Sequence, residues 1–290
     1  MDSKEKLKAS AQAISEYLTN VFPDSDMISE AMRYSLLAGG KHLRGVLLLE
    51  FAALNGVSVK SAMPFAAALE MIHTYSLIHD DLPCMDDDDF RRGKPSNHKV
   101  FGEAMAMLAG DGLLTAAFET MLLADNEISA NKRLTAAGII ARSAGYSGMV
   151  GGQSDDVVNV DGRTLTLEQL TSIELRKTGA LFIAACKAGT ALGSTDRKLL
   201  DAAESYGQAL GLAFQIRDDI LDLTSNIDVL GKAPNSDVKC GKTTFVSLMG
   251  IEKSEEEISR LTLEAVRALN VFGKPMFLVD LANDLSTRLT

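Results

Sequence analysis

The sequence contains few cysteines, and their positions exclude the roles that cysteine most often has. Its 290 residues include three, Cys84, Cys186 and Cys240, and no two of them form a Cys-x-x-Cys pair. An odd number at wide spacing favours neither a disulfide framework nor a zinc site. We therefore expect a reducing compartment, with the cytoplasm as the location.

Long apolar stretches and an excess of basic charge are also lacking. No uninterrupted apolar run reaches about 18 residues, so no transmembrane helix or membrane anchor is predicted. The first residues, MDSKEKLKASAQAISEYL, lack the apolar core of a signal peptide. With 29 Lys and Arg against 39 Asp and Glu, the net charge is −10, which argues against nucleic acid and anionic membranes as partners. The same charge would repel a phosphorylated substrate unless metal ions and local basic side chains reversed the field.

Strand patterns and internal repeats are lacking too, whereas helical periodicity is frequent. Leu7, Ala11 and Ile14 recur at the spacing of one helix face. Another helix is predicted to begin at Thr166, which can form a capping box with Gln169. By the same reasoning, helices are predicted over 3–21, 28–37, 46–55, 61–81, 104–123, 134–150, 199–223, 255–271 and 276–289. The predicted fold class is all-α.

A dense acidic stretch runs from Asp80 to Asp89. Six of these ten residues are aspartate, and Arg91, Arg92 and Lys94 follow directly. Two carboxylates about 4 Å apart repel by roughly 4 kcal/mol at an effective dielectric constant of about 20, and a divalent cation relieves that repulsion. Mg²⁺ is usually held by carboxylates together with substrate phosphate oxygens, and guanidinium groups bind phosphates bidentately. Taken alone, the stretch is equally consistent with a solvated acidic loop.

A second acidic cluster lies far away, in the segment FQIRDDILD. Asp218 and Asp222 are four residues apart and share one helix face, with Gln215 about one turn earlier. The segment is rich in Ile, Leu and Phe, so an amphipathic surface helix explains it poorly. Because a buried unpaired carboxylate is costly, metal ions or cationic partners are expected here.

The two clusters have the spacing of a known pair of motifs. They read Asp80-Asp81-x-x-x-x-Asp86 with Arg91-Arg92 behind it, and Asp218-Asp219-x-x-Asp222. Together they resemble the two aspartate-rich motifs of the trans-isoprenyl diphosphate synthases, most closely those of the bacterial farnesyl diphosphate synthase type. That type also carries the two-residue insertion seen around Pro83 and Cys84. The resemblance implies a bundle of long, mostly antiparallel helices around a deep central cavity, one polyprenyl synthetase domain over 1–290, and a homodimer.

The resemblance also implies the cofactor and its ligands. The expected cofactor is Mg²⁺, three ions per active site, with Mn²⁺ as a possible substitute. The expected metal ligands are Asp80, Asp86 and Asp218, with Asp81, Asp219 and Asp222 ligating or supporting through water.

The segment GGKHLRG, Gly39 to Gly45, has features of an anion site. Its glycines allow close approach of the backbone to a ligand, and Lys41 and Arg44 lie where the N–H groups of a following helix already favour anions. An ordinary loop between helices is the alternative, and the spacing is not that of a P-loop. The resemblance implies that Lys41 and Arg44 bind the diphosphate of isopentenyl diphosphate. His42 and Gly45 depart from the family, where Arg and Pro are common.

The predicted helix over 61–81 leads into the first acidic motif. His73 and Ser76 share a face with Asp80, and Tyr75 precedes Asp80 by five residues, about 7.5 Å along the axis. A prenyl tail running down beside this helix would meet the Tyr75 ring as a floor, although plain core packing also explains the residue. The resemblance implies that His73 helps bind isopentenyl diphosphate. It further implies that Tyr75 and Ser76 set chain length, a bulky aromatic at Tyr75 stopping growth at C15.

The segment ELRKTGALF interrupts a helical pattern at Lys177-Thr178-Gly179, so a kinked helix with free carbonyls is expected. The resemblance implies that Lys177, Thr178 and Gln215 are catalytic residues that bind the allylic substrate. It assigns Lys232 and Lys242 to the allylic diphosphate. Arg91 is assigned to that same diphosphate and Arg92 to isopentenyl diphosphate.

The predicted function is Mg²⁺-dependent condensation of isopentenyl diphosphate with dimethylallyl and geranyl diphosphates to farnesyl diphosphate. The alternatives are a geranylgeranyl diphosphate synthase, which Tyr75 argues against, and a non-catalytic prenyltransferase subunit. A class I terpene cyclase usually replaces the second motif, whereas here all three of its aspartates are present. A helical Ca²⁺-binding or scaffold module would leave the basic residues unexplained and lacks EF-hand spacing.

Overall fold

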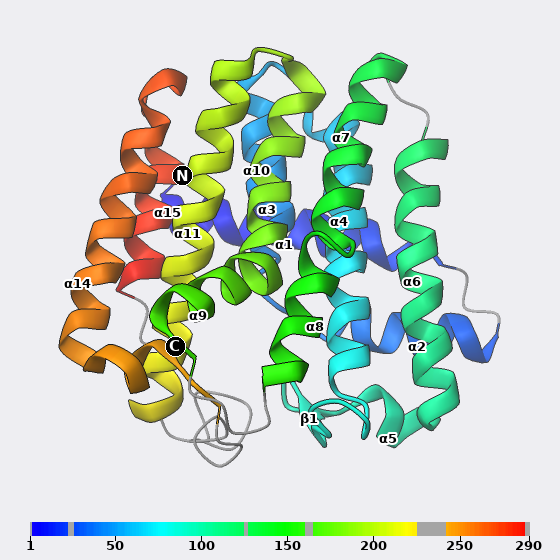
Figure 1. Cartoon of the computed structure of the whole chain (residues 1–290). Coiled ribbons are helices and arrows are strands. Elements are labelled where there is room, and N and C mark those ends of the chain that lie inside the picture. The colour runs from blue at the N-terminus through cyan, green and yellow to red at the C-terminus, as the bar shows by residue number, and fades with distance from the viewer. Residues whose placement is uncertain (1, 23–25, 125–126, 160–164, 225–241, 288–290) are drawn as a thin grey trace.

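The computed structural model describes residues 2–22, 26–124, 127–159, 165–224 and 242–287, and these form long helices (Figure 1). In chain order the helices are α1 (Ser3–Thr19), α2 (Met27–Leu36), α3 (Leu43–Leu54), α4 (Val59–Asp80), α5 (Asn97–Phe101), α6 (Glu103–Leu123), α7 (Ala130–Ala144), α8 (Met149–Asn159), α9 (Leu167–Glu174), the π-helix η1 (Leu175–Gly179), α10 (Ala180–Gly193), α11 (Arg197–Thr224), α14 (Phe245–Ala268), the 3₁₀ helix η2 (Leu269–Phe272) and α15 (Met276–Ser286). The predicted all-α class is confirmed.

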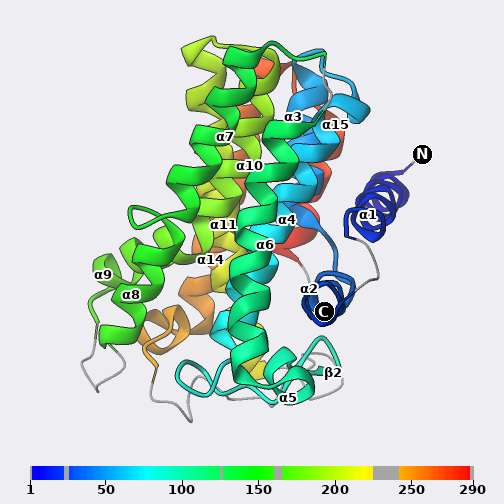
Figure 2. The same cartoon turned by 90° about the vertical axis from the view of Figure 1, so that its right-hand side faces the viewer.

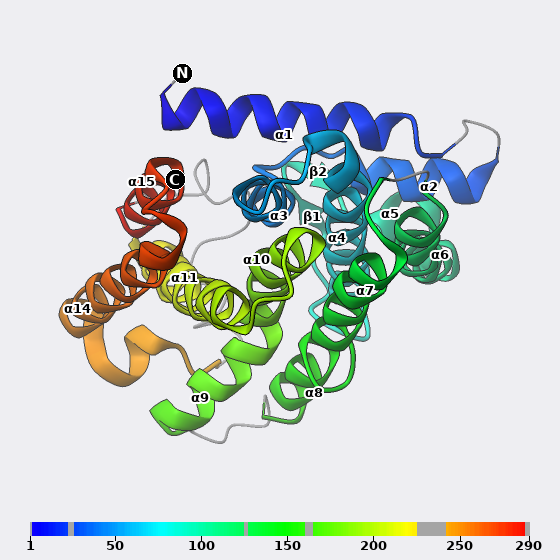
Figure 3. The same cartoon turned by 90° about the horizontal axis from the view of Figure 1, so that it is seen from above.

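The centre of the bundle is formed by helices that are buried on every side. α4 packs against α3 and α6, while α10 packs against α3, α7 and α11 (Figure 3). Phe65 and Leu69 of α4 and Phe182 and Cys186 of α10 are fully buried. Helices that are apolar all round belong in the interior of a bundle. α4 and α10 therefore form a rigid framework that positions the acidic and basic side chains described below.

α1 and α2 do not run with the bundle but lie across it, as Figures 1 and 2 show from two directions. α1 begins with a capping box in which the Asp2 side chain accepts from the Glu5 amide and the Glu5 side chain accepts from the Asp2 amide. Its apolar residues Ile14 and Leu18 are fully buried. α1 therefore packs across the sides of α3 and α4 and covers the bundle on that side.

The helix predicted over 255–271 begins earlier in the structure, because α14 starts at Phe245 and has a kink at Gly250. Two other local predictions need correction. The helix predicted over 134–150 is wrong in its bounds, because α7 ends at Ala144 and α8 begins at Met149 and continues to Asn159. Gly145 adopts an extended conformation between them, as expected of a residue that weakens helices. The second correction is a short antiparallel pair of strands, β1 (Phe90–Arg91) and β2 (Lys94–Pro95). Both turn residues, Arg92 and Gly93, have positive φ, the conformation of a tight two-residue hairpin.

α6 is the helix in the described part of the chain that is long and apolar enough to cross a membrane, judged by length and composition alone. Only 39% of its most apolar window is buried, and its mean hydropathy there is 1.3. One such helix in a helical bundle is weak evidence for a membrane. Its exposed face does, however, need an explanation.

Candidate active site

A cavity of about 480 Å³ lies between α4, α8 and η1. Ionisable side chains at its lining include Arg44, His73, Asp80 and Lys177. The rest of the lining is mainly apolar and comes largely from α8 and α10: Met149, Val150, Val157, Val158 and Leu181. A cavity of this kind suits a ligand with a charged head and a hydrocarbon tail.

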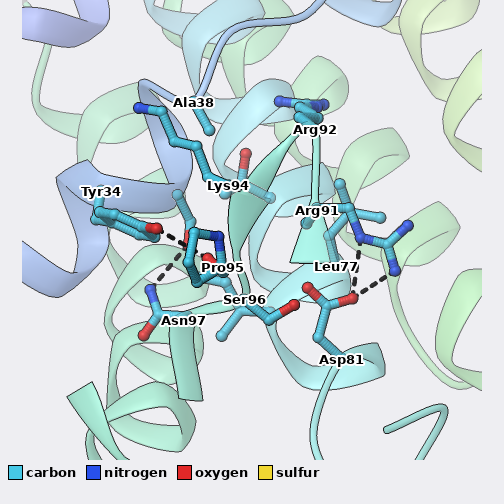
Figure 4. Close-up of a pocket in the computed structure, with 13 residues that line it drawn as sticks. Tyr34, Ala38, Leu77, Asp81, Arg91, Arg92, Lys94, Pro95, Ser96 and Asn97 are labelled. Atoms are coloured by element: carbon cyan, nitrogen blue, oxygen red, sulfur yellow. Dashed lines mark hydrogen bonds and ion pairs between the residues drawn. The ribbon is translucent and has the colours of Figure 1, made fainter. Parts of the chain in front are cut away.

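The first acidic motif is held at the end of α4 by the β1–β2 hairpin. The amide of Asp86 donates to the carbonyl of Asp80 at 2.9 Å, which folds the motif back on itself. Arg91 Nε donates to Asp81 Oδ1 at 2.9 Å, and Arg91 Nη2 donates to Asp88 Oδ2 at 2.8 Å. Figure 4 shows the Arg91 guanidinium facing the Asp81 carboxylate, while Arg92 extends away from it. Arg91 therefore contacts the first acidic motif, whereas the neighbouring Arg92 points to another part of the structure.

Arg92 connects the hairpin to the glycine-rich segment, since its Nη1 donates to the carbonyl of Gly39. In that segment Arg44 stacks over the ring of Phe182 at 4.6 Å and lies 3.3 Å from His73 Nε2. Burial, followed by the charges of Arg44 and Arg92, lowers the pKa of His73 well below its ordinary value. His73 is therefore neutral and accepts from Arg44, because a guanidinium can only donate.

The environment of Asp80 disfavours a bare carboxylate, so a cation would stabilise its charged form. Burial raises the pKa of Asp80 to about 6, with Asp86 and Asp81 adding to the effect and Lys177 and Arg91 opposing it. Lys242 Nζ lies 3.3 Å from Asp86 Oδ1. Neighbouring carboxylates that raise the pKa of Asp80 form the kind of donor set that hard cations neutralise.

The second acidic motif lies on α11. Asp219 is buried; its Oδ1 accepts from Gln215 Nε2 at 3.0 Å and its Oδ2 from the Phe245 amide at 2.8 Å, at the start of α14. Asp222 is also buried. The charge of Asp218 acts on the Arg44 guanidinium across the site. The prediction that carboxylates of this motif lie near the core is therefore confirmed. Asp218 on α11 is also close enough for its charge to act on the segment that contains Arg44.

Across the described ranges no three His, Cys, Asp or Glu side chains converge into a ready metal cage. Mg²⁺ does not require one, since it usually keeps waters and takes one or two carboxylates plus substrate phosphates. Asp81 is bonded to Arg91, whereas Asp80 lies partly buried among other carboxylates. The side chains present fit a site for Mg²⁺ bound together with a diphosphate.

The predicted irregularity at Lys177-Thr178-Gly179 is confirmed as the π-helix η1. π-Helical turns are rare and frequently lie at functional sites. α8 can approach η1 closely because it has Gly152 at the contact, where a Cβ would come within 2.3 Å of the Lys177 amide nitrogen. Lys177 Nζ lies 2.5 Å from Asp156 Oδ2. Burial alone would lower the pKa of Lys177, but Asp156, Glu174 and Asp80 together raise it, so the side chain stays charged.

The Thr178 hydroxyl contacts two side chains, one of which sequence reasoning missed. Its Oγ1 lies 3.1 Å from Gln215 Oε1 and 3.2 Å from Glu174 Oε2. Burial, followed by the charge of Asp156, raises the pKa of Glu174 to about 7, while Lys177 and Lys242 oppose that shift. Glu174 has no motif around it in the sequence, and only its distance of four residues from Thr178 on a helix could have indicated the contact.

Tyr75 and Ser76 of α4 also line the cavity. Tyr75 is buried and lines the cavity, with its ring 5.7 Å from that of His79 at 76°. Burial, and then the charge of Asp80, raises the pKa of Tyr75 to about 12, so the phenol stays neutral. Ser76 donates to the carbonyl of His73 at 2.9 Å. Both proposed chain-length residues therefore lie at the cavity.

Two predicted substrate-binding residues, Lys41 and Lys232, remain to be described. Lys41 is exposed, at the rim of the glycine-rich segment. Lys232 lies outside the described residues. The fourteen remaining predicted metal, substrate and catalytic positions lie on α3, α4, η1 and α11 or in the segments that flank α4 and α14.

The structure is an all-α bundle whose largely apolar cavity also has charged side chains in its lining. This combination indicates an enzyme that acts on a diphosphate attached to a hydrocarbon. The chain belongs to the polyprenyl synthetase family, whose model matches residues 25–270. It is a short-chain trans-prenyltransferase, in agreement with the resemblance found in its motifs.

Individual relatives cover most of the chain. Farnesyl diphosphate synthase of Bacillus subtilis (strain 168) is 44% identical over 269 residues, 92% of this chain and 89% of the relative. Chloroplastic geranylgeranyl pyrophosphate synthase 11 of Arabidopsis thaliana is 43% identical over 294 residues, 99% of this chain and 82% of the relative. The solved structure of a Helicobacter pylori geranyltransferase complexed with magnesium and isoprenyl diphosphate has a TM-score of 0.84 and 29% identity, and covers 98% of this chain and 96% of that one. The family is one of Mg²⁺-dependent prenyltransferases.

Proposed function

We propose that the chain is a farnesyl diphosphate synthase, which condenses isopentenyl diphosphate with dimethylallyl diphosphate and then with geranyl diphosphate. The observation that carries this proposal is the position of Tyr75, a buried ring that lines the cavity five residues before Asp80. A bulky ring in this position would meet the end of a growing prenyl tail and block its further growth. The similarity to the B. subtilis farnesyl diphosphate synthase supports the same product.

In this proposal the allylic diphosphate binds at Asp80 and Asp218 with Mg²⁺, and it contacts Arg91, Lys177 and Lys242. Lys177 is suited to the task because it stays charged beside Asp156 and Asp80. Lys232, outside the described residues, is assigned to the same diphosphate. When bound, Mg²⁺ neutralises the diphosphate and makes it a better leaving group.

The complete metal set that we propose is Asp80, Asp86 and Asp218 as principal ligands, with Asp81, Asp219 and Asp222 ligating or supporting through water. We propose three Mg²⁺ ions per active site, with Mn²⁺ as a substitute. The raised pKa of Asp80 supports this assignment, because burial first, and then the charges of Asp86 and Asp81, disfavour the bare carboxylate that a cation would stabilise.

Isopentenyl diphosphate would be bound by Lys41, Arg44, His73 and Arg92. Arg44 and His73 are supported by their mutual contact at the cavity, and Arg92 by its bond to Gly39. Positioned there, the double bond of isopentenyl diphosphate faces the allylic carbon. Orientation of two bound reactants is itself a large part of the rate enhancement in such reactions.

The chemistry follows from these placements. The allylic C–O bond breaks, and both of its electrons leave with the diphosphate. The π electrons of isopentenyl diphosphate then form the new C–C bond, and a proton leaves from the adjacent carbon to the departed diphosphate. Thr178 and Gln215 act as catalytic residues whose oxygen dipoles stabilise the allylic cation.

We propose a homodimer that forms through the exposed face of α6. The exposed residues of this helix recur every three or four positions along one side: Leu108, Asp111, Thr115, Glu119 and Leu122. An apolar helix that is buried on one side only is suited to packing against its symmetry mate. Sedimentation velocity would test this, with Leu108→Glu expected to give monomers and Leu134→Glu on α7 as the control.

We further propose that residues 1–290 act as one polyprenyl synthetase domain in the cytoplasm. The family match over residues 25–270 supports a single catalytic unit. Cys84 and Cys186 are both free thiols, as expected in a reducing compartment.

Product analysis tests the function. The protein is incubated with dimethylallyl and isopentenyl diphosphates, with Mg²⁺ or with excess chelator, and the prenyl products are sized. A metal-dependent C15 product is expected. A C20 product would favour the geranylgeranyl alternative, which the similarity to the A. thaliana synthase keeps open. No elongation would favour a non-catalytic subunit, against which the presence of all six motif aspartates argues.

A further inference from the structure

Glu174 begins a continuous chain of hydrogen bonds that ends at the second acidic motif. It runs from Glu174 Oε2 to Thr178 Oγ1 at 3.2 Å, on to Gln215 Oε1 at 3.1 Å, and from Gln215 Nε2 to Asp219 Oδ1 at 3.0 Å. Glu174 is the last residue of α9, Thr178 lies in η1, and the other two lie on α11. The chain therefore joins both sides of the π-helix to α11.

Asp219, at the far end of this hydrogen-bond chain, determines which atom donates in each of the bonds. An ionised carboxylate such as Asp219 can only accept, so the NH₂ group of Gln215 must face it. The carbonyl oxygen of Gln215 then faces Thr178, and it needs a donor. The Thr178 hydroxyl has a single proton, and donating it to Gln215 leaves the hydroxyl with none for Glu174.

The contact between Glu174 and Thr178 is consequently complete only when Glu174 supplies the proton itself. An ionised Glu174 would compete with Gln215 for the one hydroxyl proton, leaving one of two partly buried oxygens without a donor. An unmade buried hydrogen bond costs more than an ordinary one contributes.

We propose that Glu174 is a positioning residue that carries a proton in the working enzyme and donates it to Thr178. This rests on the proposed catalytic roles of Thr178 and Gln215. With one lone pair accepting from Glu174 and its proton given to Gln215, the Thr178 oxygen keeps a second lone pair for the cavity that it lines. That lone pair faces the region in which the allylic cation forms.

The surroundings of Glu174 agree with a protonated side chain. Burial, followed by the charge of Asp156 on α8, raises the pKa of Glu174 to about 7. The charges of Lys177 on η1 and Lys242 ahead of α14 oppose this, and so would a hydrogen bond donated by Thr178 to Glu174. That last effect is absent when Thr178 gives its proton to Gln215. Lys177 is already bonded to Asp156 at 2.5 Å.

The test compares Glu174→Gln with Glu174→Leu and the wild-type enzyme. Glutamine reproduces the protonated acid, because its NH₂ can donate to Thr178 at any pH. Leucine removes the donor. Turnover and the KM for each substrate are measured with Mg²⁺ from about pH 6 to about pH 8.5. Glu204→Gln, a carboxylate on α11 that contacts Lys187, is the matched control.

We expect the ratio of kcat in Glu174→Gln to kcat in wild type to rise severalfold with pH, while the ratio for Glu204→Gln stays flat. Glu174→Leu should lose about tenfold or more in kcat at every pH, with KM changed much less, as expected for an interaction that matters mainly in the transition state. In a Thr178→Val background the two Glu174 changes should have no further effect, since the chain is already broken.

A pH-independent ratio for Glu174→Gln, or a full effect of the Glu174 changes in the Thr178→Val background, would overturn the proposal. Loss of turnover in Glu174→Gln with a native circular dichroism spectrum would overturn it as well. These outcomes differ from a failure of the proposed function, in which the wild-type enzyme itself makes no prenyl product.

Discussion

Glu70 and His42 form a buried pair at the base of the glycine-rich segment, with 2.9 Å between Glu70 Oε2 and His42 Nδ1. The other oxygen of Glu70 accepts from the Gly45 amide at 2.8 Å, and His42 Nε2 lies 2.9 Å from Ser15 Oγ. Burial alone would raise the pKa of Glu70, but the bonds from His42 and Gly45 and the charge of Arg44 hold it below its ordinary value. The two residues that depart from the family pattern thus both bind one carboxylate, and proline at position 45 would have no amide to donate.

This relationship predicts that Glu70→Ala loosens the segment that contains Lys41 and Arg44. His42 and Gly45 would lose their partner inside the protein, at a cost of about 3 kcal/mol in the free energy of unfolding. We also expect a higher KM for isopentenyl diphosphate and a smaller change in the KM for geranyl diphosphate. Urea unfolding and initial rates measure both. Ser15→Ala is the control and should cost less than about 1.5 kcal/mol; equal losses in the two variants would contradict the prediction.

Tyr75→Ala should lengthen the product beyond C15. The change removes the ring that lines the cavity and leaves room beside His79, whose ring now packs edge-on against it. Chain sizing of the products with Mg²⁺ measures the effect, and the metal requirement should not change. Tyr75→Phe keeps the ring and serves as the control, with C15 retained. An unchanged C15 product from Tyr75→Ala would mean that another residue stops growth.

Much of this site was predictable because helical spacing and charge are local properties of sequence. The i,i+4 relation of Asp218 and Asp222 and the break at Lys177-Thr178-Gly179 needed no tertiary information, and the structure has both on the expected elements. The hairpin was missed because its strands have two residues each, too few for any alternation to register.

The residues that sequence reasoning missed are single carboxylates without a motif around them, and the partners of Glu70 are also distant in sequence. Glu70 lies 25 residues from Gly45 and 28 from His42, so only folding brings them together. Within α4, a lone Glu in an apolar run gave no indication of which side chains it would contact. The break between α7 and α8 was missed for a related reason: the apolar residues on both sides of Gly145 fit one continuous helical period.

The raised pKa of Glu174 also predicts that the stability of the protein depends on pH. This pKa is about 7 in the folded protein, against an ordinary value of 4.5. The folded state therefore binds the proton more tightly, and the resulting stabilisation is complete below about pH 4.5 and is lost as pH rises through about 7. Glu174→Gln has no such loss. Its free energy of unfolding, minus that of wild type, should therefore increase by about 1–2 kcal/mol between about pH 5 and pH 8. Urea unfolding at both pH values measures this, and a difference that falls as pH rises would refute it.

The last prediction concerns Arg217, which is buried beside the second acidic motif and holds the chain's last described helix. Its two Nη atoms donate to Glu255 at 2.6 and 2.5 Å, and Nη2 also donates to the carbonyl of Ser286 at the end of α15. A lysine has no fork and cannot make these bonds together. Arg217→Lys should therefore lower the free energy of unfolding by about 2 kcal/mol.

Arg260 provides the matched comparison for Arg217, since it too contacts two acceptors, Glu257 and Glu264 on its own helix. Its side chain is 58% exposed, against 8% for Arg217. Solvent screens an exposed pair, so Arg260→Lys should change stability by less than about 0.5 kcal/mol. If the two substitutions cost the same in urea unfolding, burial and the bond to Ser286 are not what make Arg217 matter. A larger loss for Arg217→Lys would show that the tie between α11 and α15 stabilises the helix that carries Asp218 and Asp222.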